Sequence, residues 1–157
     1  MKILAVASCG GHWEELIRIT NQLSKRYSIA YACTRDDVAI SIPEGHNLFV
    51  IDDFNRNSSY KIFSCFFKAF KIILKEKPNI IISTGAAPGM ITLFAGWLMR
   101  KKCIWIDSIA NIHKLSMSCR LLIPFNIRIY TQWEHLQTAR VIYAGSILGQ
   151  AMSKQVI

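Results

Sequence analysis

The sequence contains no apolar run long enough to cross a membrane. Its longest nearly unbroken run, residues 86–99, includes Pro88 and two glycines and falls short of the ~20 residues that a spanning helix needs. Charged residues are also scarce, at 18% against 52% hydrophobic residues, and this balance excludes intrinsic disorder. Because domains contain about 100–200 residues, the length predicts one domain that spans residues 1–157.

The sequence also lacks the cysteine and histidine spacing of a disulfide framework or a metal site. The five cysteines are odd in number, lie far apart and form no C-x-x-C pair. The four histidines have no metal-ligand spacing. We therefore expect reduced cysteines, a cytosolic protein and no bound metal.

Acidic residues are rare in the later part of the chain. Residues 1–53 contain five basic and seven acidic side chains, a net charge of −2, whereas the chain after Asp53 contains fourteen and three, a net charge of +11. The mean hydropathy is nevertheless positive, at +0.25. A domain that is both apolar and basic favours an anionic partner, a membrane surface or a second subunit. Nucleic acid is disfavoured, because the basic residues form no recognisable binding module.

What the sequence does contain is an alternation of short apolar runs and helical patterns. The continuous apolar run at residues 79–83 is typical of a strand that is buried on both faces. The alternation predicts an α/β fold, a Rossmann-like parallel sheet flanked by helices. We expect strands at residues 2–7, 28–33, 46–51, 79–83, 102–107, 128–131 and 139–144, and helices at residues 12–25, 60–77 and 88–100.

The helix expected at residues 60–77 is amphipathic. At 100° per residue, its apolar side chains fall within an arc of roughly 140° and its lysines cluster opposite. This pattern is typical of a helix that covers a sheet and leaves its lysines in water. The alternative is that the lysines face anionic lipid head groups. The apolar arc consists of Ile62, Phe63, Phe66, Phe67, Phe70, Ile73 and Leu74, and the lysines are Lys61, Lys68, Lys71 and Lys75.

The helix expected at residues 88–100 is apolar on almost every side and ends in three basic residues. Such a helix must be buried in the domain, in a partner or in a bilayer interface. The basic triplet favours the bilayer interface as one of these three places, because anionic lipid attracts basic side chains. The candidate membrane-contact residues are Met90, Phe94, Trp97, Arg100, Lys101 and Lys102.

Three strand-to-helix turns form the candidate ligand site, because ligands of parallel sheets bind beyond the carboxyl ends of the strands. The turns are Ser8–His12, Ser83–Gly89 and Asp107–Asn111. Gly10 and Gly11 let the backbone approach a ligand, and the helix N-terminus behind them favours an anion such as a diphosphate. Glycine turns of this kind also occur in α/β proteins that bind no phosphate.

Two side chains at these turns are candidates for acid–base chemistry. His12 follows the glycine pair, where an imidazole can act as a base or donate to a phosphate; simple exposure or helix capping is the alternative. Asp107 ends an apolar strand, where it can act as a base or accept from a hydroxyl; helix capping is again the alternative.

A nucleotide-binding oxidoreductase is a weaker hypothesis for the same turns. Asp36 and Asp37 follow the second strand, where a ribose-binding acid would stand. However, His12 and Trp13 occupy the place where the G-x-G-x-x-G fingerprint has its later glycine.

The motifs in this order resemble one family, the bacterial capsule and exopolysaccharide glycosyltransferase enhancer subunits. That family is similar to the membrane-anchoring subunit of the eukaryotic two-component N-acetylglucosaminyltransferase of dolichol-linked glycan synthesis. The resemblance covers nearly the whole chain. It rests on Ser8–His12, Ser83–Gly89, Trp105–Ser108, Lys114–Leu122, Tyr130–Glu134 and Tyr143–Gly145.

The resemblance implies the N-terminal, acceptor-side half of a GT-B glycosyltransferase such as the lipid-II-forming enzyme of peptidoglycan synthesis. A partner subunit would supply the other half and hold the nucleotide sugar, expected to be a UDP-sugar, so that this chain binds no cofactor itself. The chain would present a polyprenyl-diphosphate-linked acceptor while lying peripherally on an anionic membrane, at the cytoplasmic face of the plasma membrane. A non-catalytic scaffold for a partner glycosyltransferase is the alternative.

The resemblance also implies roles for particular residues. The residues expected at the acceptor diphosphate or the reacting centre are Gly10, Gly11, His12, Thr84, Gly85 and Ser108. Asp107 is expected to orient or deprotonate the acceptor hydroxyl. The residues expected at the cleft or the partner interface are Gln132, Trp133 and Glu134.

Four positions depart from the family's pattern. The family usually has Glu at Asp107, Arg at Asn111 and Gly at Cys119, and a proline between the aromatic and the acid that correspond to Trp133 and Glu134. The shorter Asp107 weakens the acid–base assignment, and Asn111 removes a cation that would have met phosphate.

Overall fold

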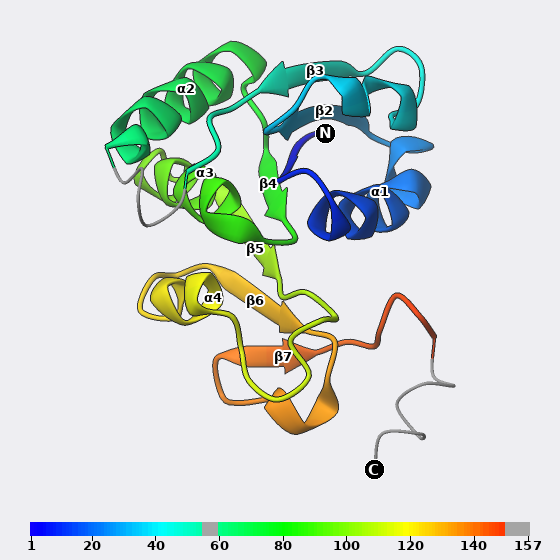
Figure 1. Cartoon of the computed structure of the whole chain (residues 1–157), viewed down its shortest axis with the longest axis vertical. Helices are drawn as coiled ribbons and strands as arrows, with labels where there is room; N and C mark the ends of the chain where they lie inside the picture. The colour runs from blue at the N-terminus through cyan, green and yellow to red at the C-terminus, as the bar shows by residue number, and fades with distance from the viewer. Residues whose placement is uncertain (55–59, 150–157) are drawn as a thin grey trace.

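The computed structural model describes residues 1–54 and 60–149, and it confirms the predicted α/β fold (Figure 1). One sheet of seven strands has the order β3-β2-β1-β4-β5-β6-β7, and every pairing is parallel. The predicted domain, residues 1–157, includes two segments outside the described residues, 55–59 and 150–157. The strands are β1 (Lys2–Ala7), β2 (Ser28–Cys33), β3 (Asn47–Val50), β4 (Ile80–Ser83), β5 (Lys102–Ile106), β6 (Arg128–Thr131) and β7 (Val141–Tyr143).

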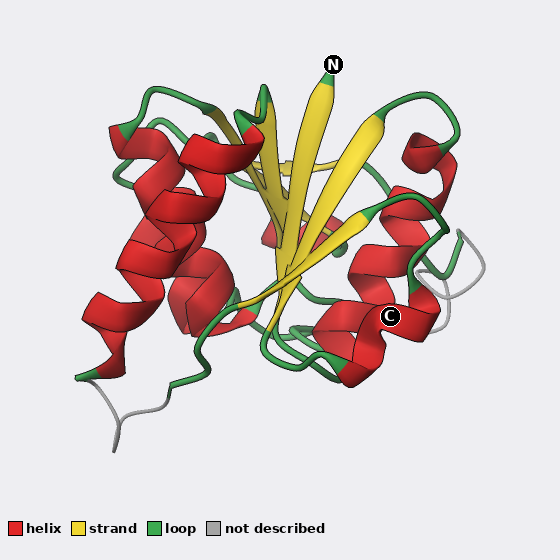
Figure 2. Cartoon of the chain, turned by 90° about the horizontal axis from the view of Figure 1, so that it is seen from above, coloured by secondary structure: helices red, strands yellow, loops and turns green. Residues whose placement is uncertain are grey.

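Helices lie on both sides of the sheet (Figure 2). The sequence pattern missed the six-residue α4, which Ser116 caps, and the two short 3₁₀ helices of the described residues. It also began α3 two residues late, since Pro88 lies inside the first turn, where proline is tolerated. The helices are α1 (Gly11–Ser24), α2 (Lys61–Glu76), α3 (Ala86–Leu98) and α4 (Met117–Leu122), and the 3₁₀ helices are η1 (Asp37–Ser41) and η3 (Glu134–Leu136).

The strand order reverses direction between β1 and β4, and this places the candidate site. Alternate residues of β1 point to opposite faces of the sheet. Ile3 packs in the cluster that contains Leu16 of α1, while Leu4 packs in the cluster that contains Leu93 of α3. The turns into α1 and α3 therefore leave neighbouring strands toward opposite faces. Such a switch point opens a crevice at the carboxyl ends of the strands, where ligands of this architecture bind.

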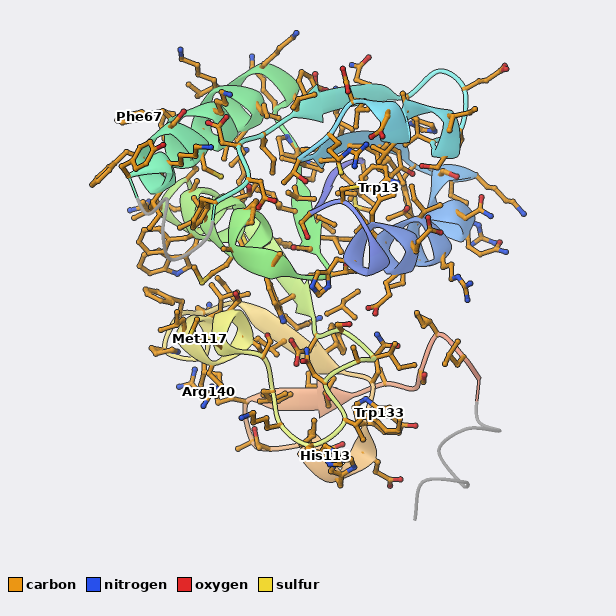
Figure 3. The ribbon with its side chains drawn as sticks, viewed as in Figure 1. Trp13, Phe67, His113, Met117, Trp133 and Arg140 are labelled. Carbon is orange, nitrogen blue, oxygen red and sulfur yellow. The ribbon has the colours of Figure 1, made fainter. Side chains whose placement is uncertain are left out.

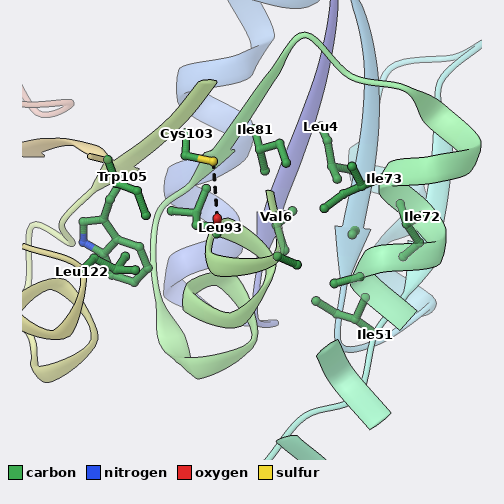
Figure 4. Packing of buried hydrophobic residues seen from close by; sticks show 14 of the residues in the cluster. Leu4, Val6, Ile51, Ile72, Ile73, Ile81, Leu93, Cys103, Trp105 and Leu122 are labelled. Atoms are coloured by element: carbon green, nitrogen blue, oxygen red, sulfur yellow. Dashed lines mark hydrogen bonds between the residues drawn. The ribbon is translucent and has the colours of Figure 1, made fainter. Parts of the chain in front are cut away.

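The larger core cluster lies between the sheet and helices α2, α3 and α4 (Figure 4). Trp105 is fully buried and lies beside Leu122, and the thiol of Cys103 donates to the backbone oxygen of Leu93 at 3.4 Å. Burial raises the pKa of the Cys103 thiol to about 12, so this cysteine stays a neutral, packed side chain. The five cysteines are free.

Helix α2 covers the sheet as expected, but not with the face that the pattern indicated. Its buried side chains are mainly Cys65, Ala69, Ile72, Ile73 and Glu76, of which only Ile73 belongs to the predicted apolar arc. The small side chains of this face let the helix approach the sheet closely. Glu76 is buried there because it forms an ion pair with Lys2 at the start of β1.

The rest of the predicted arc is divided: Ile62, Phe66 and Phe70 are half-buried, and Phe66 packs against the core cluster, whereas the other three residues face outward. Phe63, Phe67 and Leu74 are 71%, 60% and 52% exposed, and Phe67 points away from the rest of the chain (Figure 3). No helix of the described residues is long and apolar enough to span a membrane.

Candidate functional site

The β1–α1 turn leaves open space above its glycine pair. Gly10 has a φ of +98°, a backbone conformation that favours glycine, and it lies at the N-cap of α1. A Cβ atom added at Gly10 or Gly11 would meet no atom within 4 Å. No side chain caps this helix end, so the first backbone N–H groups of α1 remain available to an anion.

The β4–α3 turn comes into direct contact with the first. The hydroxyl of Thr84, itself fully buried, donates to the backbone oxygen of His12 at 2.6 Å. A Cβ atom at Gly85 would lie only 2.2 Å from Nδ1 of His12, so the imidazole ring occupies the space that any larger residue would need. Gly85 is also the N-cap of α3, again without a side-chain cap. The structure thus brings His12, Thr84 and Gly85 together between two uncapped helix N-termini.

His12 has an unusual environment for an imidazole. Among the described residues, its buried Nδ1 atom has no hydrogen-bond partner, and its Nε2 atom makes no hydrogen bond either. A buried polar atom without a partner costs free energy, and a catalytic role is one of the few reasons for which such an atom is retained. The ring is held by contact with Gly85 rather than by hydrogen bonds, which leaves Nε2 available to a ligand.

Asp107 is placed differently from the accessible base that its position in the sequence suggested. Its side chain is 1% exposed, and its two oxygens accept four hydrogen bonds. Oδ1 accepts from Trp105 Nε1 and Ser116 Oγ, at 3.0 and 2.6 Å, and Oδ2 accepts from Asn111 Nδ2 and the Ser116 amide, at 3.2 and 3.0 Å. The carboxylate therefore holds the loop between β5 and α4, and its lone pairs are occupied.

A second buried carboxylate, Glu15, lies one turn along α1 from His12. The sequence did not predict it as a site residue. It is 7% exposed. Its Oε1 atom accepts from Ser108 Oγ at 2.7 Å and from the Ile109 amide at 3.3 Å, and its Oε2 atom accepts from Gln132 Nε2 at 3.3 Å. The one sequence feature that could have indicated its burial is its position at the border of the apolar face of α1, near Ile19. Ser108, predicted to contact the acceptor, is 5% exposed, and its hydroxyl is already engaged by Glu15.

The three residues predicted at the cleft or partner interface separate into inner and outer positions. Gln132 is buried and also donates to the backbone oxygen of Asp107 at 3.1 Å. Trp133 is 9% exposed and donates from Nε1 to the backbone oxygen of Ile109, whereas Glu134 is exposed. Gln132 also lines a hollow of about 390 Å³ between α1, β6 and the segment after β7.

The predicted membrane-contact residues do not form one exposed surface. Met90, Phe94 and Trp97 are half-buried, and the rings of Phe94 and Trp97 stack at 5.7 Å between centroids. Their aromatic cluster is completed by Phe125, which follows α4.

The basic triplet after α3 lies at the start of a strand rather than on the helix. Lys102 is the first residue of β5, and Arg100 and Lys102 are exposed while Lys101 is half-buried. Within residues 1–54 and 60–149, no group of three His, Cys, Asp or Glu side chains could hold a metal ion.

Comparison with known proteins gives one family and one fold. The family model described as "Oligosaccharide biosynthesis protein Alg14 like" matches residues 51–147. A Candida albicans protein named "UDP-N-acetylglucosamine transferase subunit ALG14" is 30% identical over 166 residues, which cover 88% of this chain and 74% of that protein. The Yarrowia lipolytica protein of the same name is 32% identical over 74 residues, which cover 43% of this chain and 34% of that protein.

Among solved structures, the chain resembles the Acinetobacter baumannii protein MurG. The TM-score is 0.76 at 12% sequence identity, and the alignment covers 91% of this chain and 45% of the MurG chain. This likeness shows the fold alone, and that fold agrees with the GT-B half that the family resemblance implied. The chain thus spans less than half the length of this structural relative.

Proposed function

The chain belongs to the Alg14-like family of oligosaccharide biosynthesis proteins, and on this basis we propose that it is the acceptor-binding subunit of a two-component glycosyltransferase. A donor-binding partner holds the UDP-sugar, in keeping with the transferase-subunit name of the relatives. This chain presents a polyprenyl-diphosphate-linked acceptor for capsule or exopolysaccharide synthesis. It does so as a peripheral protein at the cytoplasmic face of the plasma membrane.

The contact of His12 with Gly85, between two uncapped helix N-termini, is the observation that carries the proposal. Both helix ends direct unpaired N–H groups and a positive dipole end toward the same crevice, and each of these features stabilises a diphosphate. The open space above Gly10 and Gly11 leaves room for that group.

The chemistry assigned to His12 is general-base catalysis of an inverting transfer. The acceptor hydroxyl attacks the anomeric carbon of the nucleotide sugar, its proton passes to Nε2 of His12, and the nucleoside diphosphate leaves with the bonding electrons. Asp107 is not given the role of base, because four hydrogen bonds occupy its carboxylate. It positions the loop after β5 instead.

The membrane contact is assigned to the outer surface of α2 rather than to α3. Phe63, Phe67 and Leu74 share one face of α2, and Tyr60 at its start is 73% exposed. Exposed apolar patches beside basic residues are typical of surfaces that lie in a bilayer interface. We call this surface the α2 outer face; its exposed residues are Tyr60, Phe63, Phe67 and Leu74, with Lys61, Lys68, Lys71 and Lys75 on the adjoining side of the helix.

Reconstitution with a donor-binding subunit tests the proposed function. We expect sugar transfer to a polyprenyl-diphosphate acceptor by the complex and little or none by this chain alone. His12→Ala should lower turnover of the complex by about 100-fold or more while the complex still forms. Full activity of this chain alone would contradict the two-subunit proposal. Unchanged turnover of the His12→Ala complex would instead make the chain a scaffold for a self-sufficient partner.

A further inference from the structure

Glu15 connects four of the chain segments that surround the candidate site. It follows the first turn of α1, and its carboxylate accepts hydrogen bonds from Ser108 and Ile109 in the loop after β5. The same carboxylate accepts from Gln132 at the end of β6, and Oε1 of Gln132 accepts from the Ile147 amide after β7 at 3.1 Å. Glu15 thus ties the helix that carries His12 directly to the segments after β5 and β6, and through Gln132 to the segment after β7.

The charge of Glu15 is costly where it lies. Taking a carboxylate out of water is unfavourable, and a cationic partner usually compensates for it. Within residues 1–54 and 60–149, Glu15 forms no ion pair, and its contacts come from a hydroxyl, a backbone amide and a side-chain amide. Hydrogen bonds to an ionised acceptor are shorter and about twice as strong as neutral ones. The charge of Glu15 therefore strengthens the hydrogen bonds that hold Ser108 and Ile109 in place.

The loop that Glu15 holds is also fixed from its other side. Asp107 binds Asn111 and Ser116, and Trp133 donates to Ile109, the residue whose amide donates to Glu15. Of these contacts, only those of Glu15 reach α1, the helix that carries His12. The position of the loop relative to His12 therefore depends on Glu15.

We propose that Glu15 is a positioning residue of the transferase: its carboxylate sets the loop of residues 108–116 at a fixed position relative to His12, so that the acceptor is held by both. This inference rests on the proposed function. Since both elements lie on the acceptor side, the loss of Glu15 affects the acceptor and leaves the nucleotide sugar on the partner subunit unaffected.

Glu15→Gln tests this role, with Glu14→Gln as its matched control. Glutamine keeps the size and one acceptor oxygen, but it turns an N–H group toward the N–H group of Gln132. Glu14 is the exposed residue that precedes it in the same helix, so its replacement changes the net charge by the same amount near the same helix end. Thermal unfolding of both variants checks that each is folded.

The first readout is amide hydrogen exchange of the full chain. In Glu15→Gln we expect exchange of residues 108–116 to be about tenfold faster, equivalent to about 1.4 kcal/mol, with less than a twofold change elsewhere and in Glu14→Gln. Equal exchange of this loop in the two variants would overturn the inference.

The second readout is steady-state kinetics of the complex with the donor-binding subunit. We expect kcat/KM for the acceptor to fall about tenfold with a raised acceptor KM, while the KM for the nucleotide sugar stays unchanged. A purely structural loss would lower the amount of active complex without moving either KM. Wild-type acceptor kinetics in Glu15→Gln would overturn the inference.

The two readouts separate this inference from the proposed function. A wild-type complex that transfers no sugar would contradict the proposed function and the catalytic part of this inference together. The exchange comparison would still decide whether Glu15 holds the loop.

Discussion

The carboxyl edge of the sheet and the α2 outer face differ in whether their side chains find partners within the chain. At the edge, Asp107, Glu15 and Gln132 are buried, and each is satisfied by several hydrogen bonds. On the α2 outer face, Phe63 and Phe67 are mostly exposed, beside lysines. Buried polar groups that are satisfied as these three are indicate a geometry that the chain fixes by itself. Exposed aromatic rings indicate a surface that contacts another molecule.

This difference predicts two kinds of mutational effect. Substitutions at the carboxyl edge should lower the free energy of unfolding, the activity or both, because they break contacts within the chain. Substitutions on the α2 outer face should leave the fold intact and change only what the chain binds.

The largest effect is expected from Gly85→Ala. The added Cβ atom would lie 2.2 Å from Nδ1 of His12, so the imidazole must leave its position. We expect the free energy of unfolding to fall by about 3 kcal/mol and the activity of the complex to fall by about 100-fold. Chemical denaturation and a transfer assay measure the two effects.

Gly11→Ala serves as the control for that substitution, because its Cβ atom meets nothing within 4 Å. It should leave the free energy of unfolding unchanged and reduce only acceptor binding. If Gly85→Ala were as stable and as active as wild type, the result would contradict the close contact between His12 and Gly85.

The next effect in size is expected from Asp107→Asn. The new amide group would face the N–H donors of Asn111 and Ser116, where a carboxylate oxygen now accepts from both. We expect a loss of about 2–3 kcal/mol in the free energy of unfolding, because buried donors lose their acceptor.

The matched control is Asp36→Asn at an exposed site, which should change stability by less than about 0.5 kcal/mol. Loss of activity in Asp107→Asn at wild-type stability would restore Asp107 as a direct participant in the reaction and contradict its positioning role.

A smaller effect should separate the α2 outer face from the edge. The double change Phe63→Ser and Phe67→Ser removes two rings that are 71% and 60% exposed. We expect binding to anionic liposomes to weaken by about tenfold or more, with stability unchanged within about 0.5 kcal/mol. Flotation at several salt concentrations is the measurement.

Ile40→Ser is the control for liposome binding, because Ile40 is 95% exposed but lies on η1, away from α2. Its binding should equal that of wild type. No binding by wild type, alone or in the complex, would contradict the assignment of α2 to a membrane.

The smallest effect concerns the segment that leads into α2. Hydrogen bonds from Lys68 and then Ser64 hold the pKa of Asp52 below its ordinary value. The stabilisation is therefore present above the ordinary pKa of an aspartate and is lost as the pH falls through the lowered value. Asp52→Asn should cost about 0.5 kcal/mol at pH 7 and nothing at the acid end of that range. The exposed Asp53→Asn is the control in the same denaturation series, and an equal effect of both variants at every pH would contradict this pairing.

The alternation of strands and helices was predictable because each buried strand is a short apolar run between glycine or polar turns. In parallel sheets the turns that follow the strands lie at one edge, so the proximity of His12 and Gly85 could be predicted from the sequence. The burial of Glu15 was not predictable, because its partners Ser108 and Gln132 follow β5 and β6, which lie far along the chain.

The orientation of α2 was also beyond the sequence pattern. Periodicity shows which side chains share a helical face, but the face that packs on the sheet is set by fit. The small Cys65 and Ala69 fit against the strands, and the larger Phe63 and Phe67 remain outside.

The central claim is that the crevice between β1 and β4 holds the diphosphate of the acceptor. An NMR titration of the isotope-labelled chain with a short isoprenyl diphosphate tests it most directly. We predict that the amide signals of Gly10, Gly11, His12 and Gly85 shift together, and that the same titration of Gly85→Ala gives no such shift. Shifts confined to other parts of the chain, or no shift of the wild-type signals at millimolar ligand, would contradict the account.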